Sequence, residues 1–134
     1  MTARYLLDSN ILSDLVSRPG GRVAARLEAL GYDQVCTSII VASEMRYGVI
    51  RKGSQRLAER VEGILGRIPV ISFAPPVDEV YGRVRADLER RGTPIGHLDC
   101  LIAAHALTLD CTIVTANERE FSRVTGLRLE NWLR

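Results

Sequence analysis

Short apolar runs, most of them containing β-branched residues, alternate along this chain with longer stretches of helical period. Strands are predicted at RYLLD (4–8), QVCTS (34–38), VISF (70–73), CTIVT (111–115) and LRLENW (127–132). The predicted helices cover residues 9–17, 22–30, 39–52, 54–68, 77–92, 96–107 and 117–124. Strands that alternate with helices favour a parallel sheet covered by helices on both faces. We therefore expect an α/β fold.

Length and cysteine usage limit the remaining choices. A chain of 134 residues, 46% of them hydrophobic, predicts one domain over residues 1–134 with a sizeable core. Cys36, Cys100 and Cys111 are an odd number without a CxxC spacing, so we expect buried free thiols rather than a disulfide framework or a zinc ribbon. No apolar run approaches the length of a membrane span, and no signal peptide is evident. These features predict a cytoplasmic protein without a membrane partner.

The charge balance is nearly even, with 18 Lys+Arg against 16 Asp+Glu. This balance excludes a nucleic-acid binder that works by bulk charge alone. Lys52 is nevertheless the only lysine, so all other basic residues are arginines. Arginine binds phosphate in a bidentate manner, which is compatible with an RNA partner. A genome rich in GC codons is an equally good explanation.

Polar residues follow two of the predicted strands directly. Asp8, Ser9 and Asn10 come after the first strand, and Thr115 and Asn117 come at the end of the strand at 111–115. Ligands of open parallel sheets bind beyond the carboxyl ends of the strands. The sequence therefore predicts a functional site at this edge of the sheet.

Acidic residues fall into two groups. On the helix at 77–92, Glu79, Arg83, Asp87 and Arg91 are spaced by four with alternating sign, which predicts a solvated face with weak ion pairs. Asp8, Glu44 and Asp99 instead border apolar segments, and Glu44 and Asp99 have no basic residue three or four positions away. A buried carboxylate without compensation is costly.

Each of these three acids also has a purely structural explanation. Asp8 suits a helix cap, Asp99 suits the first turn of a helix on which Leu98 belongs to the apolar face, and Glu44 could meet an arginine from elsewhere in the fold. Taken together, clustered carboxylates suit Mg²⁺ or Mn²⁺. A metal site made of acids suggests phosphodiester chemistry, because such an ion activates water and neutralises phosphate charge.

Four segments together carry a resemblance to a known family: YLLDSNILSDL, SIIVASEMRYG, GHLDCLIAAHAL and TIVTANEREFSRVTGLRLENW. They resemble PIN domains, and more narrowly the VapC toxins of bacterial toxin–antitoxin pairs, over essentially the whole chain. The resemblance implies a three-layer α/β/α fold with a short, mostly parallel sheet. It also implies a Mg²⁺- or Mn²⁺-dependent endoribonuclease that cleaves RNA, with tRNA as a favoured substrate, and thereby inhibits translation and growth.

The resemblance also assigns roles to individual residues. It implies that Asp8, Glu44 and Asp99 are catalytic metal ligands and that Asn10 and Thr115 support them. Many family members carry Asp where this chain has Asn117, which we expect to be a supporting residue. Glu120 matches a further acidic position and could complete the catalytic site. Alternatively, Glu120 is a surface acid paired with Arg123, three positions away.

The same resemblance implies partners. The first is a cognate VapB-type antitoxin, whose C-terminal segment would wrap the toxin and place an arginine or an acid in the site. The second is another copy of the chain, in a homodimer. Promoter DNA would be bound only through the antitoxin complex. Arg46, Arg51 and Arg119 are candidates to contact the RNA backbone.

Two alternative functions remain open at this stage. A non-catalytic PIN-like module that binds RNA or protein would explain the loss of the fourth acid. A phosphatase of the haloacid-dehalogenase type also uses an Asp after the first strand, but it needs an acid where this chain has Asn10 and would have to use Lys52. His97 and His105, eight residues apart on one helix, are expected to be surface or packing residues, although a general base near Asp99 is the alternative.

Overall fold

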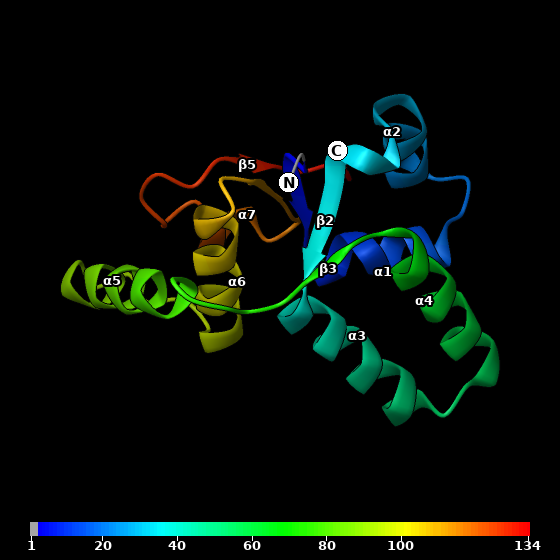
Figure 1. Ribbon diagram of the computed structural model, residues 1–134, viewed down its shortest axis with the longest axis horizontal. Coiled ribbons are helices and arrows are strands. Elements are labelled where there is room, and N and C mark those ends of the chain that lie inside the picture. Colours follow the sequence, from blue (N-terminus) through cyan, green and yellow to red (C-terminus); the bar gives the residue numbers. More distant parts are fainter. Residues whose placement is uncertain (1–2) are drawn as a thin grey trace.

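The central strand of the fold is β1 (Tyr5–Leu7), which has neighbours on both sides in the computed structural model (Figure 1). The structure describes residues 3–134. The sheet has the order β3-β2-β1-β4-β5 and every strand pair is parallel, with Leu6 opposite Cys36 on one side and Ile113 on the other. The other strands are β2 (Val35–Ser38), β3 (Val70–Ile71), β4 (Thr112–Val114) and β5 (Leu129–Glu130).

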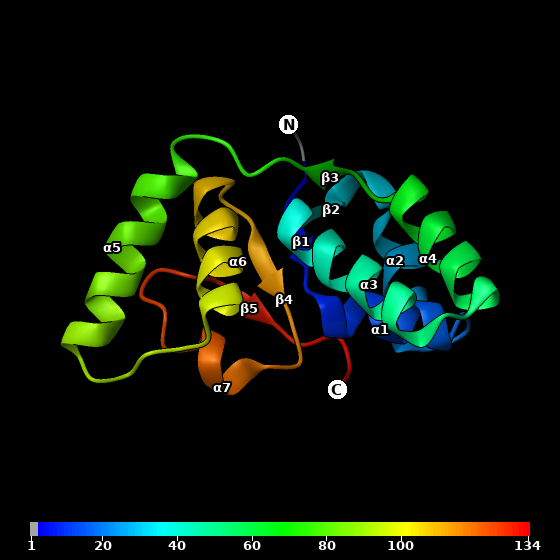
Figure 2. The same cartoon turned by 90° about the horizontal axis from the view of Figure 1, so that it is seen from below.

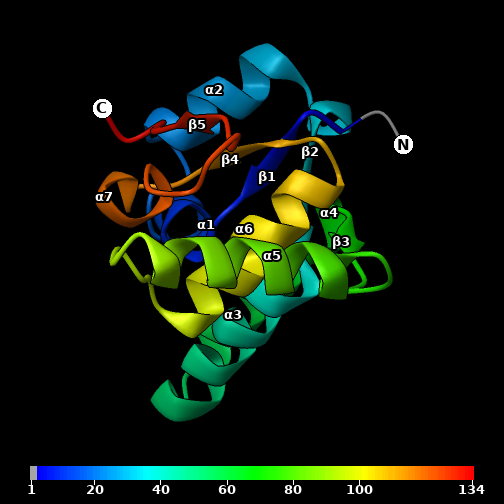
Figure 3. The ribbon, with the colours of Figure 1, turned by 90° about the vertical axis from the view of Figure 1, so that its left-hand side faces the viewer.

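Helices cover the sheet on both faces. They are α1 (Ser9–Ser17), α2 (Arg22–Leu30), α3 (Ile39–Lys52), α4 (Gln55–Arg67), α5 (Val77–Arg90), α6 (His97–Thr108) and α7 (Glu118–Phe121). Seen along the sheet, α2 lies on one side of the strands while α5 and α6 lie on the other (Figure 3). The two pairs α3–α4 and α5–α6 pack side by side at opposite ends of the molecule (Figure 2). The predicted α/β fold with three layers is thus confirmed.

Local signals account for the ends of α3. The Ser38 hydroxyl accepts a hydrogen bond from the Ile40 N–H at 3.0 Å, which caps the first turn. Gly53 then ends the helix at φ +68°, a left-handed conformation that glycine adopts without the strain a Cβ would cause. These two residues set the bounds of α3, which agree with the helix expected at 39–52.

Three predicted elements differ in extent from the structure. The strand expected at 70–73 stops at Ile71, because the Phe73 ring leaves the sheet and packs against His105 at a centroid distance of 5.3 Å. The helix expected at 117–124 forms only as α7, and the strand expected at 127–132 forms only as β5. In addition, a short 3₁₀ turn at Tyr32–Gln34 was not predicted. These differences arise from tertiary contacts and turn geometry rather than from hydrophobic period.

The core lies between the sheet and the helices and takes in both sides of α6. Cys100, Ile102, Ala103 and Ala106 on α6 are buried, because this helix packs between α5 and the sheet. The expectation that Leu98 belongs to this apolar face was wrong. Leu98 is 48% exposed, because it lies in the first turn, at the end of the helix. The three cysteines are free and buried, as predicted.

No helix within residues 3–134 could span a bilayer. The longest, α3 and α5, have 14 residues each, whereas a span needs about 20.

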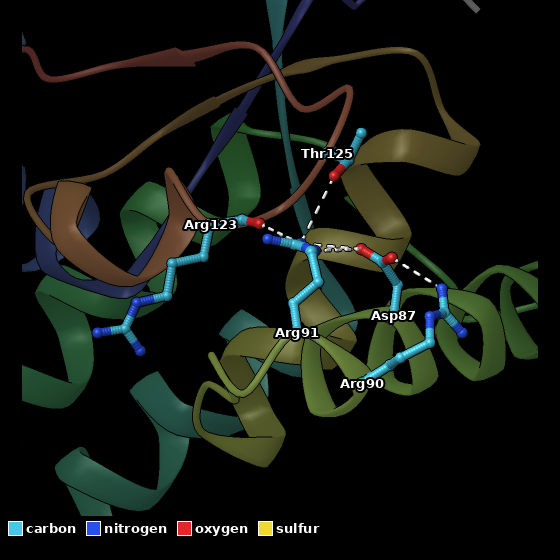
Figure 4. A network of polar contacts seen from close by, with 5 residues as sticks. All are labelled: Asp87, Arg90, Arg91, Arg123 and Thr125. Atoms are coloured by element: carbon cyan, nitrogen blue, oxygen red, sulfur yellow. Dashed lines mark hydrogen bonds and ion pairs between the residues drawn. The ribbon is translucent and has the colours of Figure 1, made fainter.

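The predicted charged face of α5 contains a network around Asp87 (Figure 4). Asp87 pairs with Arg90 at 2.9 Å and with Arg91 at 2.8 Å, whereas the ion pairs found in residues 3–134 include neither Glu79 nor Arg83. The Arg91 guanidinium also donates to the backbone carbonyl of Arg123 at 2.7 Å. The network therefore ties α5 to the segment that follows α7.

Candidate active site

Asp8 lies where β1 ends and α1 begins, and it is only 2% exposed. Its Oδ1 accepts the Ser9 N–H at 2.8 Å, while its Oδ2 accepts the Thr115 hydroxyl at 2.8 Å and the Asn10 amide at 3.2 Å. Burial raises the pKa of Asp8, and these donors oppose that shift. Asp8 thus does cap α1, as one explanation held, but a helix cap accounts for only one of its two oxygens.

Asn10 and Thr115 hold this carboxylate between two neighbouring strands. The Asn10 side chain donates to Thr115 Oγ1 at 3.3 Å and accepts the Ala116 N–H at 2.9 Å. Thr115, directly after β4, in turn accepts the Asn117 N–H at 3.0 Å. These contacts join the carboxyl ends of β1 and β4, which is the edge where the sequence predicted a site.

Glu44 reaches the same region from α3, and no cationic side chain of residues 3–134 pairs with it. Its side chain is half-buried, and its Oε1 is buried without a hydrogen-bond partner among residues 3–134. Burial raises the pKa of Glu44, and the charge of Asp8 adds to this effect. The arginine partner considered from the sequence is absent in the described part of the chain, where no ion pair includes Glu44, Asp8 or Asp99.

Asp99 and Glu120 form a carboxyl pair with Asn117 between them. Asn117 Nδ2 donates to Asp99 Oδ2 and to Glu120 Oε2, both at 3.2 Å. Burial, a hydrogen bond with Glu120 and repulsion from neighbouring acids raise the pKa of Asp99 to about 7. The hydrogen bond with Asp99 lowers the pKa of Glu120. Asp99 therefore holds the proton that the two carboxyls share.

The alternative that Glu120 is a surface acid paired with Arg123 is therefore wrong. Its hydrogen bonds run to Asp99, Asn117 and the Gly96 backbone. Arg123 instead donates to the Pro94 carbonyl at 2.9 Å. The sequence left open whether Asn117 or Glu120 completes the cluster, and the structure brings both into contact with Asp99.

The donor set suits a hard divalent cation, although the side chains are not preassembled. Carboxylate oxygens are the ligands that Mg²⁺ and Mn²⁺ prefer. Within residues 3–134 no three acidic, His or Cys side chains already lie in a ligating arrangement. The Glu44 Oε1 without a partner and the raised pKa of Asp99 nevertheless fit a site that a cation would stabilise.

A groove of about 390 Å³ begins at Glu44 and runs between α1, α3 and α4. Most of its lining is apolar, including Met45, Val49 and Leu57, with Lys52 at the far end of α3. Of the three predicted RNA-contact residues, one is engaged in an ion pair and two are exposed. Arg46 is ion-paired with Glu62 on α4, while Arg51 and Arg119 are exposed.

Residues 5–127 match the PIN domain family. The chain belongs to this family. The PIN-domain chain is 35% identical to ribonuclease VapC2 of Rickettsia felis, over 96% of its own length and 97% of that protein. It is also 35% identical to the tRNA(fMet)-specific endonuclease VapC of Shigella flexneri, over 96% and 98% of the two chains. The PIN-domain chain is thus an endoribonuclease of the VapC group, which removes the haloacid-dehalogenase alternative.

Solved structures agree with this placement of the PIN-domain chain. The crystal structure of VapBC2 from Rickettsia felis, bound to a DNA fragment from its promoter, contains a chain that superposes with a TM-score of 0.86. The two are 34% identical, and the match covers 96% of this chain and 98% of the other. PIN-domain nucleases are in general dependent on divalent metal ions.

Proposed function

We propose that Asp8, Glu44 and Asp99 form the catalytic centre of a Mg²⁺- or Mn²⁺-dependent endoribonuclease and hold its metal ion. One observation carries this proposal. Acids that follow β1 and lie on α3 and α6 influence one another at the carboxyl edge of the sheet, no arginine or lysine of residues 3–134 pairs with them, and one Glu44 oxygen has no partner there. A bound ion would supply Lewis-acid chemistry, polarising the phosphate and lowering the pKa of a water molecule.

The neighbouring residues orient and charge these ligands. Thr115, Asn10 and the Ser9 N–H fix the Asp8 carboxylate by hydrogen bonds on both of its oxygens. Asn117 holds Asp99 and Glu120 side by side. Supporting groups of this kind set ligand orientation and affinity in metal sites.

Glu120 is the ionised partner of the pair. A carboxyl group must lose its proton to become a metal ligand. Glu120 has a lowered pKa and accepts the hydrogen bond of Asp99, whose pKa is about 7, so Asp99 would give up its proton to solvent on becoming a ligand. An ionised Glu120 supplies the negative charge that Asn117 lacks, where many family members carry Asp.

The substrate we propose is tRNA, because a relative that matches nearly the full length is a tRNA(fMet)-specific endonuclease. The partner we propose is a VapB-type antitoxin, because a near-full-length structural neighbour is a VapBC complex. The apolar groove beside Glu44 suits a partner segment that ends in a basic residue near the acids. We further propose a homodimer that reaches promoter DNA only through the antitoxin, as part of a toxin–antitoxin pair.

The test is cleavage of bulk tRNA by the purified chain with Mg²⁺, with Mn²⁺ and with EDTA. Discrete cuts that require metal and are lost in D8N support the proposal, and sequencing of the cut ends identifies the target. The matched control is D14N, because Asp14 lies on α1 and pairs with Arg18 away from the cluster. Cleavage that persists in D8N contradicts the assignment. Absence of both cleavage and metal binding would favour a non-catalytic binding module.

A further inference from the structure

A buried hydrogen bond joins the helix that carries Asp99 to the start of the helix that carries Glu44. His105 lies on α6, six residues after Asp99, and its Nδ1 is 2.7 Å from Ser38 Oγ. Ser38 is the cap of α3, and neither side chain has measurable solvent exposure. The two residues are 67 positions apart in the sequence, so this contact exists only in the folded chain.

The surrounding hydrogen bonds suit donation from the Ser38 hydroxyl to His105 Nδ1. The Ser38 hydroxyl oxygen already accepts the Ile40 N–H, so its own proton is available to donate. Donation to Nδ1 places the imidazole proton on Nε2, which faces the backbone of Ser72. Burial lowers the pKa of His105, in keeping with a neutral ring.

The surroundings of His105 exclude two simpler roles. The ring packs edge-to-face against Phe73, and among residues 3–134 no hydrogen bond or ion pair joins it to an acid of the site. His105 is therefore neither a metal ligand nor a general base at the reacting phosphate. His105 Nε2 is buried without a well-aligned hydrogen-bond partner in residues 3–134, which costs free energy. An apolar residue would fill the same space and avoid this cost.

We propose that His105 is a positioning residue, which by holding Ser38 fixes the start of α3 against α6 and so sets the spacing of Glu44 and Asp99. This inference rests on the proposed metal site. A rigid connection is needed because the two acids repel one another and no direct contact joins them in residues 3–134. Without the connection, α3 can shift relative to α6 and the ligands no longer converge.

The chain supplies a matched pair of variants for the test. S38A removes a helix cap and the contact with His105, whereas S54A removes only a cap, since Ser54 accepts the Leu57 N–H at 3.2 Å on α4. H105L removes the ring but keeps an apolar side chain of comparable bulk. H105N retains an acceptor near the Nδ1 position. Mn²⁺ affinity is measured on the full chain by electron paramagnetic resonance, together with kcat and KM for tRNA.

We expect H105L and S38A to bind Mn²⁺ about 10–100-fold more weakly than the parent, with a lower kcat and an unchanged KM, and H105N to recover most of this loss. S54A should lose stability without losing affinity. H105L with the affinity and kcat of the parent overturns the inference. Equal losses in S38A and S54A also overturn it, because they indicate a general effect on folding. A parent chain that binds no Mn²⁺ overturns the proposed metal site and this inference with it.

Discussion

Replacing Asp99 with Asn should stabilise the metal-free protein at alkaline pH. The pKa of Asp99 in the folded chain, about 7, lies above the ordinary aspartate pKa of 3.8. In the window between these values the folded chain holds a proton that the unfolded chain has lost, so stability falls as pH rises from about 4 to about 7 and stays low above it. Asn mimics the neutral carboxyl and removes this loss.

The expected size follows from the same shift. If the whole pKa difference of Asp99 appeared as free energy of unfolding, it would amount to about 4 kcal/mol, at about 1.4 kcal/mol per pKa unit. Asp99 is only half-buried, however, and Glu120 shifts in the opposite direction, so both solvent screening and the partner reduce the effect. We therefore expect D99N to raise the free energy of unfolding at pH 8 by about 1–2 kcal/mol, with little effect at pH 4.

Urea unfolding in EDTA at a series of pH values checks this expectation. D87N is the matched control, because Arg91 lowers the pKa of Asp87. Removing the Asp87 charge should therefore reduce the free energy of unfolding at neutral pH. With added Mn²⁺, the free energy of unfolding of the parent should rise rather than fall with pH, since only the ionised carboxyl binds the ion. D99N should show no such reversal. A D99N protein no more stable than the parent at pH 8 would refute this account of Asp99.

Three further outcomes are expected. D8N should lower the cleavage rate by at least about 100-fold at saturating Mg²⁺ while far-UV circular dichroism stays unchanged, because a ligand is lost but a neutral cap remains. N117D should tighten Mn²⁺ binding by up to about tenfold in a titration, and should destabilise the metal-free chain, because it adds charge beside Asp99 and Glu120. L6A should reduce the free energy of unfolding by about 2–5 kcal/mol in urea, since Leu6 is fully buried on the central strand.

Local pattern was sufficient to predict most of the fold. The buried strands β1 and β2 are short apolar runs, and the ends of α3 follow from the cap at Ser38 and the left-handed Gly53. The alternation of strands and helices then leaves a parallel sheet as the arrangement that buries both faces. The position of Asp8 at the carboxyl edge follows from this arrangement alone.

Features that depend on distant contacts were not predictable in the same way. Leu98 shares helical spacing with the apolar residues of α6 yet is exposed, because it lies in the first turn of that helix. Arg46 lies two residues after Glu44 but turns to Glu62 on the adjacent helix. The hydrogen bond between His105 and Ser38 could not be inferred from spacing, because it requires the relative placement of α3 and α6.

The acids of the site repel one another, so contacts outside the cluster must hold their elements in place. Arg91 on α5 binds the Arg123 carbonyl, and Arg123 binds the Pro94 carbonyl, which fixes the segment after α7 to the loop that leads into α6. His105 connects α6 to the start of α3. The contacts of Arg123 and His105 each join two segments that carry acids of the site, and neither uses a carboxylate of the site. No arginine or lysine of residues 3–134 pairs with Asp8, Glu44 or Asp99, and the proposed metal site depends on this.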